Sequence, residues 1–128
     1  MSEWMTALHD WNLDPAAAVA KQREMATRLT LTPPWGASPG EWPATITGVD
    51  IGFEDGGEVT RAAVVTLDLA TLEPLEQQLI RQPTRMPYIP GLLSFRELPA
   101  AIAALESLER APECLMVDGH GIAHPRRL

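Results

Sequence analysis

The pattern of apolar and polar positions predicts three strands in succession. Residues 45–53, Thr-Ile-Thr-Gly-Val-Asp-Ile-Gly-Phe, carry β-branched and aromatic bulk, and a second run of this kind spans 59–69. The intervening Glu-Asp-Gly-Gly-Glu contains glycines that suit a hairpin turn. A third run, 74–83, has a proline at each end, and prolines limit a strand. We therefore expect three antiparallel strands.

Two helices are predicted, one before and one after these strands in the chain. Asp14 is a suitable N-cap before Pro15 at the first helical position, and an Ala-rich run continues to about residue 29. The second helix is expected to begin at Ser94, with Glu97 in the capping-box position three residues later. Apolar residues then recur at helical spacing: Leu98, Ile102, Leu105 and Leu108.

A fourth strand is predicted after Pro112 ends the second helix. The short apolar run 114–117 is typical of a parallel strand that is buried on both faces. It leads directly into Asp118 and a Gly-His-Gly segment. Open α/β sheets tend to place their sites at the carboxyl ends of such strands, so Asp118 is a candidate site residue.

Composition narrows the class of protein without deciding its partner. The 128 residues fit one domain, and the net charge of −7 argues against a generally basic nucleic-acid-binding protein. Charge is uneven, however: residues 1–80 hold four basic and twelve acidic side chains, whereas residues 81–128 hold six basic and five acidic ones. A local positive rim can still contact phosphates, so placement matters more than the total.

The cysteine count and the first thirty residues indicate a cytoplasmic protein. One cysteine excludes an internal disulfide and a multi-thiolate metal site. The first thirty residues contain polar groups throughout, so we expect no signal peptide and no membrane span.

Three carboxylates are candidates for a metal site: Asp50, Glu97 and Asp118. A charge within an apolar strand is costly, so Asp50 is expected to pair with an arginine such as Arg61 or to bind a cation. From spacing alone, the capping role is the preferred explanation of Glu97. If the three converge, their oxygens suit Mg²⁺ or Mn²⁺, which can activate water for phosphodiester cleavage.

A zinc site is disfavoured. His120 and His124 lie close to glycines in a loop, without the helical context or thiolates of the usual zinc ligand patterns.

Three segments closely resemble successive motifs of the endonuclease V family. They are 48–53 (Gly-Val-Asp-Ile-Gly-Phe), 87–97 (Pro-Tyr-Ile-Pro-Gly-Leu-Leu-Ser-Phe-Arg-Glu) and 117–127 (Val-Asp-Gly-His-Gly-Ile-Ala-His-Pro-Arg-Arg). The resemblance covers most of the chain from about Asp14 onward, in the family's order and spacing. It implies one α/β domain, residues 1–128, with a ribonuclease H-like fold: an antiparallel three-strand sheet extended by a parallel strand and flanked by helices.

The resemblance also implies a Mg²⁺-dependent endonuclease of DNA repair, with Mn²⁺ as an alternative ion. Such enzymes cleave the second phosphodiester bond 3′ to deoxyinosine in DNA or, in some members, to inosine in RNA. Asp50, Glu97 and Asp118 match the family's metal-binding carboxylates and would be the catalytic residues.

The remaining matches concern nucleic-acid binding. Tyr88 and the adjacent prolines, including Pro90, match the family's wedge, which enters the base stack and helps to extrude a nucleotide. Other matches line the hypoxanthine pocket: Gly91, Leu93, Gly119 and Gly121. His124 and Arg126 are assigned to the nucleic-acid backbone.

The chain departs from the family pattern in stopping at Leu128. Full-length members continue through another parallel strand and helices, which supply a lysine and a further metal-site residue. We therefore expect the isolated chain to lack the C-terminal part of the fold, to be poorly stable or self-associating, and to cleave weakly. Two alternatives stay open: a non-catalytic nucleic-acid-binding remnant, and a general metal-binding or interaction module.

Overall fold

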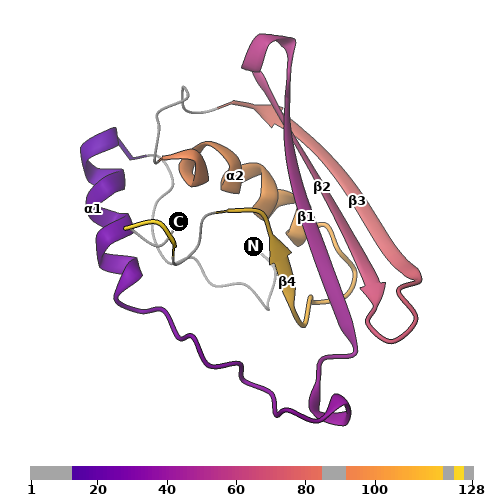
Figure 1. Cartoon of the computed structure of the whole chain (residues 1–128). Coiled ribbons are helices and arrows are strands. Elements are labelled where there is room, and N and C mark those ends of the chain that lie inside the picture. Colours follow the sequence, from indigo (N-terminus) through magenta and orange to yellow (C-terminus); the bar gives the residue numbers. More distant parts are fainter. Residues whose placement is uncertain (1–12, 85–91, 120–122, 126–128) are drawn as a thin grey trace.

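The computed structural model describes residues 13–84, 92–119 and 123–125, with only the backbone of Leu93 and Ser94. A four-stranded sheet in the order β3-β2-β1-β4 forms its centre (Figure 1). The strands are β1 (Thr45–Glu54), β2 (Val59–Asp68), β3 (Pro74–Pro83) and β4 (Leu115–Val117). β1, β2 and β3 are antiparallel, and β4 pairs with β1 in parallel, as the sequence predicts.

The β1–β2 hairpin keeps a one-to-one register along its whole length. Pairing runs from Thr45 opposite Asp68 to Glu54 opposite Val59. The turn is a 3₁₀ segment, η2 (Asp55–Gly57), in which Gly56 has φ 67° and Gly57 has φ 97°. Glycine adopts positive φ without a steric penalty, so the two glycines allow the chain to reverse direction between β1 and β2.

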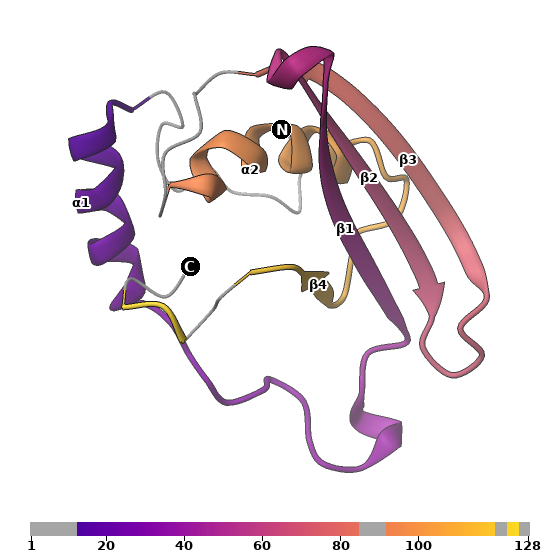
Figure 2. The same ribbon diagram turned by 45° about the horizontal axis from the view of Figure 1, so that its top comes forward.

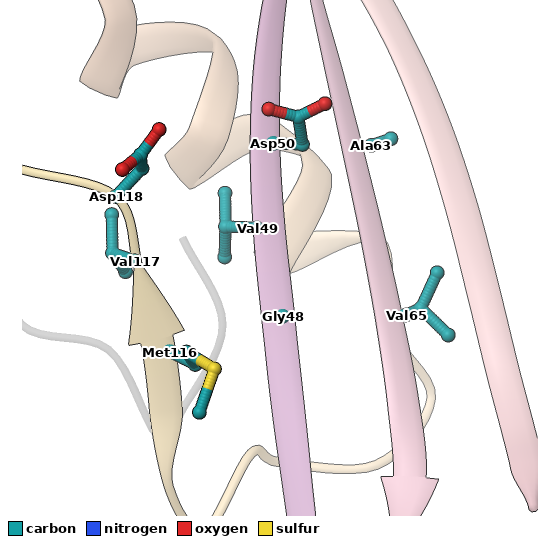
Figure 3. A pocket seen from close by; sticks show the side chains of 8 residues that line it. All are labelled: Gly48, Val49, Asp50, Ala63, Val65, Met116, Val117 and Asp118. Carbon is teal, nitrogen blue, oxygen red and sulfur yellow. The ribbon is translucent and has the colours of Figure 1, made fainter.

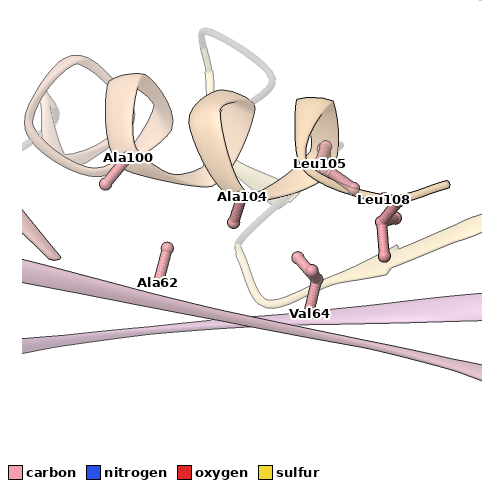
Figure 4. Packing of buried hydrophobic residues seen from close by; sticks show 6 residues of the cluster. All are labelled: Ala62, Val64, Ala100, Ala104, Leu105 and Leu108. Carbon is pink, nitrogen blue, oxygen red and sulfur yellow. The ribbon is translucent and has the colours of Figure 1, made fainter. Parts of the chain in front are cut away.

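Helix α2 (Leu93–Glu106) covers one face of the sheet. Small side chains allow the close approach: Ala100 and Ala104 pack against Ala62 and Val64 (Figure 4). Leu105 and Leu108 complete this buried cluster, as predicted, whereas Leu98 and Ile102 are only partly buried. The predicted apolar stripe is thus partly wrong, because the face that meets the sheet is built on alanines.

The predicted start of α2 at Ser94 is wrong. The N-cap residue is Leu92, which has no capping hydrogen bond from its side chain. Leu92 is only 2% exposed and belongs to an apolar cluster with Phe95 and Ala18. Burial of this leucine, rather than a hydroxyl cap, therefore accounts for where the helix begins.

Helix α1 (Pro15–Ala26) lies on the far side of α2 from the sheet (Figure 2). Its predicted cap is confirmed, since the Asp14 carboxylate accepts a hydrogen bond from the Ala17 amide at 2.8 Å. The helix ends three residues before the predicted end, and Leu29 is exposed instead of continuing an apolar stripe. A second 3₁₀ segment, η1 (Pro39–Glu41), lies in the connector to β1.

Strand β4 is exposed, contrary to the prediction of a strand buried on both faces. Leu115, Met116 and Val117 are 45%, 65% and 54% exposed. β4 is at the edge of the sheet and, within the part of the chain that the structure describes, β1 is its sole strand neighbour. Apolar composition predicted burial, but burial depends on neighbours that a sequence run does not specify.

Neither described helix combines the length and the apolar character that crossing a membrane requires.

Candidate active site

Asp50 and Asp118 lie on neighbouring parallel strands at matching positions. Val49 is paired with Val117, so each aspartate is the next residue along its strand. Neighbouring strands are about 4.8 Å apart. Both aspartates line one cavity of about 480 Å³, and Figure 3 shows their carboxylates at the same end of it. The rest of the lining comes from the adjoining strands: Gly48, Val49, Ala63, Val65, Met116 and Val117.

The Asp50 side chain lies on the face of the sheet away from the core under α2. Val49 and Ile51 pack against the core under α2. Since side chains alternate along a strand, Asp50 projects to the opposite face, where it is exposed. The expectation that Asp50 is a charge held within an apolar environment is therefore wrong.

The alternative of a salt bridge between Asp50 and Arg61 is also wrong. Arg61 donates to Glu54 at 2.9 Å, and no ion pair joins Arg61 to Asp50 among the residues described. Asp50 is exposed where it lines the cavity.

Glu97 lies in the second turn of α2, on the other side of the sheet from the Asp50 side chain, and the charges of both aspartates still act on it. Burial raises the pKa of the Glu97 carboxyl above its ordinary value, and the negative charges of Asp118 and Asp50 raise it further. The charge of Arg96 acts in the opposite direction. The capping role is wrong, because the helix begins at Leu93 and Glu97 lies beyond the N3 position that a capping box requires.

Arg96 connects this turn of α2 to the strand that carries Asp50. Its guanidinium carbon lies 3.9 Å from the centroid of the Phe53 ring, a cation–π contact. Its Nε is buried and has no hydrogen-bond partner among the described residues. Neither Arg96 nor Phe53 is among the site residues predicted from the sequence; the one feature of the sequence that points to Arg96 is its position directly before the candidate ligand Glu97.

The donor set fits a hard divalent ion. Carboxylate oxygens are the ligands that Mg²⁺ and Mn²⁺ prefer, and the negative charges of Asp118 and Asp50 act on Glu97. In the described part of the chain, however, no three histidine, cysteine, aspartate or glutamate side chains form a group close enough to hold a metal. The structure brings Asp50 and Asp118 together, and joint coordination with Glu97 stays a prediction.

The other predicted site residues are placed only in part. Gly119 follows Asp118 at the exposed end of β4, His124 is partly buried, and the backbone of Leu93 starts α2. The rest lie outside the described residues: Tyr88, Pro90, Gly91, Gly121 and Arg126.

Comparison with known proteins identifies the family. The family model described as endonuclease V matches residues 23–128. The chain belongs to the endonuclease V family. Endonuclease V from Azotobacter vinelandii (strain DJ / ATCC BAA-1303) is 53% identical over 121 residues, which cover 93% of this chain and 52% of the relative. That of Xanthomonas campestris pv. campestris (strain B100) is 51% identical over 117 residues, 91% of this chain and 48% of the relative.

Solved endonuclease V structures share the fold. The Streptomyces avermitilis protein aligns with a TM-score of 0.77 at 39% identity, covering 91% of this chain and 50% of that one. The Bacillus subtilis protein aligns with a TM-score of 0.80 at 28% identity, covering 94% of this chain and 51% of that one. The predicted fold class, an antiparallel three-strand sheet extended by a parallel strand, is confirmed, and the ribonuclease H-like class is consistent with these structures. The chain spans about half the length of the endonuclease V relatives that it matches.

Proposed function

We propose that this member of the endonuclease V family is a metal-dependent endonuclease of DNA repair. The observation that carries the proposal is the pairing of Asp50 and Asp118 on adjacent strands at one cavity, with Glu97 within reach of both charges. A carboxylate at the carboxyl end of a parallel strand, beside a second carboxylate on the neighbouring strand, is suited to phosphodiester hydrolysis.

Asp50, Glu97 and Asp118 would hold Mg²⁺ or Mn²⁺. Such an ion, when bound, supplies activation of water and stabilisation of the leaving oxygen. The chain's own contribution is orientation. β1 and β4 hold two of the carboxylates in parallel register, and the Arg96–Phe53 contact ties the helix turn that carries Glu97 to β1. Rigid elements under each ligand reduce the entropy lost when an ion and a phosphate bind.

We further propose that the substrate is DNA containing deoxyinosine, or RNA containing inosine, cleaved at the second phosphodiester bond 3′ to the lesion. Family membership supports this proposal. Ciona intestinalis endonuclease V was solved in complex with a 23mer DNA containing an inosine followed by a ribo-adenosine; it aligns with a TM-score of 0.70 at 21% identity, which shows a common fold. In this chain Tyr88 and Pro90 would form the wedge.

The base pocket and backbone contacts complete the proposal. Gly91, Leu93, Gly119 and Gly121 would line the pocket for the extruded base, where small residues allow backbone groups to approach it. His124 and Arg126 would contact the nucleic-acid backbone.

The proposal places the protein in the cytoplasm, in keeping with its single cysteine.

The test uses two matched duplexes that differ only in deoxyinosine or deoxyguanosine at one position. The purified protein is incubated with each, in Mg²⁺ and in a chelator, and the labelled strands are sized. We expect one cut, in Mg²⁺ only and only in the deoxyinosine strand. Binding without cutting would instead support the non-catalytic alternative, and neither binding nor cutting would refute both.

A further inference from the structure

Two arginines share the face of the sheet that carries Asp50. Ala62 and Val64 of β2 face the core, so Arg61 and Ala63 face the other way, and Ala63 lines the cavity together with Asp50. Arg81 of β3 is directly opposite Arg61 in the strand register. Like charges in directly opposed positions are destabilising, so this pair requires a compensating partner.

Glu54 is that partner, and it accepts hydrogen bonds from both arginines. Its Oε1 lies 2.9 Å from Arg61 Nη1, and its Oε2 lies 3.1 Å from Arg81 Nε. The hydrogen bond from Arg81, assisted by Arg61, holds the pKa of Glu54 below its ordinary value. Two cations against one carboxylate leave a net positive charge on the group, and each guanidinium keeps further N–H donors. The arginine side chains are 41% and 54% exposed.

Gly52 determines where the Arg61 guanidinium lies. A Cβ built at Gly52 would come within 2.5 Å of Arg61 Nη2, so the arginine lies directly over the glycine. Gly52 and Asp50 are two residues apart on the same face of β1, which corresponds to about 7 Å along a strand. A nucleic-acid strand advances about 3.4 Å per nucleotide. The arginine pair is thus within a few nucleotides of a phosphate placed at Asp50.

We propose that Arg61 and Arg81 bind a backbone phosphate of the nucleic-acid strand that lies across Asp50 and Asp118. The inference rests on the proposed function and adds to it a binding subsite on β2 and β3. Guanidinium groups bind phosphate oxygens in a bidentate manner, and Glu54 holds both in place before the strand arrives. On a chain of net charge −7, a local positive group beside the carboxylates also offsets their repulsion of the phosphates.

The test is the salt dependence of binding. A fluorescent deoxyinosine duplex is titrated with protein at several salt concentrations without divalent ions, so that it stays intact. Because each phosphate contact contributes about 0.9 to the slope of log K against log salt, Arg81→Gln and Arg61→Gln should each reduce the slope by about 1. Arg28→Gln is the matched control, since Arg28 is also ion-paired, with Glu24, and is 51% exposed.

A second variant separates binding from structure. Glu54→Gln keeps both arginines and an oxygen that can accept a hydrogen bond from them, and it removes one negative charge, so it should tighten binding to the duplex even where it lowers Tm. The inference is overturned if both arginine variants keep the parent's slope of log K against log salt and Glu54→Gln changes Tm without changing binding. Such a result would show that the three residues form an ordinary surface ion pair. Failure of the parent protein to bind nucleic acid at any salt concentration would overturn the proposed function as well.

Discussion

The guanidinium of Arg96 packs on the ring of Phe53, 3.9 Å from its centroid. Arg96 precedes Glu97 on α2, and Phe53 follows Asp50 by three residues on β1. One contact therefore joins the two elements that carry these candidate ligands, and Gly57 of the β1–β2 turn leaves room for it, since a Cβ there would lie 2.9 Å from Arg96 Nη2.

The first prediction concerns the strength of this contact. Phe53→Leu keeps an apolar side chain and removes the aromatic face, so the lost cation–π contact should cost about 0.5–2 kcal/mol of unfolding free energy. Arg96→Met removes the charge from the same contact. A double-mutant cycle by urea unfolding should give a coupling of this size. Strict additivity of the two changes would show that the contact contributes nothing.

The second prediction concerns pH. Burial, Asp118 and Asp50 raise the pKa of Glu97 above its ordinary value of 4.5. A carboxyl with a higher pKa in the folded state stabilises the fold below its unfolded pKa and loses that contribution as the pH rises through the folded pKa. Glu97→Gln should therefore raise Tm at neutral pH, with the gain disappearing below about pH 4.5. A difference in Tm that is the same at every pH would contradict this cause.

The third prediction concerns metal binding without turnover. A bound ion stabilises the folded state by about 2.7 kcal/mol at a hundred times its Kd, so Mg²⁺ or Mn²⁺ should raise Tm. Asp50→Asn should abolish most of this shift. Asp55→Asn is the control, because it makes the same change of charge in the exposed turn at the end of β1. Equal shifts in all three proteins would place the ion elsewhere.

The fourth prediction concerns the edge of the sheet at β4. Exposed apolar side chains on an edge strand favour edge-to-edge association, and Met116, on β4 at the edge of the described sheet, is 65% exposed. We expect the protein to associate with rising concentration in sedimentation experiments, and Met116→Lys to reduce the association. A monodisperse parent protein at all concentrations would contradict this expectation.

Local patterns predicted the β1–β2 hairpin, because the β-branched residues of the two runs and the glycines at 56 and 57 act over a few residues. The start of α2 depended on tertiary burial of Leu92, which outweighed a local capping pattern at Ser94. The exposure of β4 likewise depended on neighbouring elements rather than on its own composition.

The candidate site was predicted chiefly through the resemblance of its three motifs. The pairing of Val49 with Val117, which sets Asp50 beside Asp118, joins positions far apart in the chain. Neither helical nor strand periodicity carries that information. Arg96 was missed because its role depends on Phe53, another long-range contact.

The most direct measurement is cleavage of a 5′-labelled deoxyinosine duplex in Mg²⁺ by the parent protein, Asp118→Asn and Asp55→Asn. If Asp50, Glu97 and Asp118 form the catalytic site, the parent and the turn variant should produce the same strand, cut at the second phosphodiester 3′ to the lesion. Asp118→Asn should lose at least about a hundredfold in rate, since groups that stabilise the reacting charge commonly contribute 10²–10³. Cleavage by Asp118→Asn at the parent rate would contradict the assignment of this site.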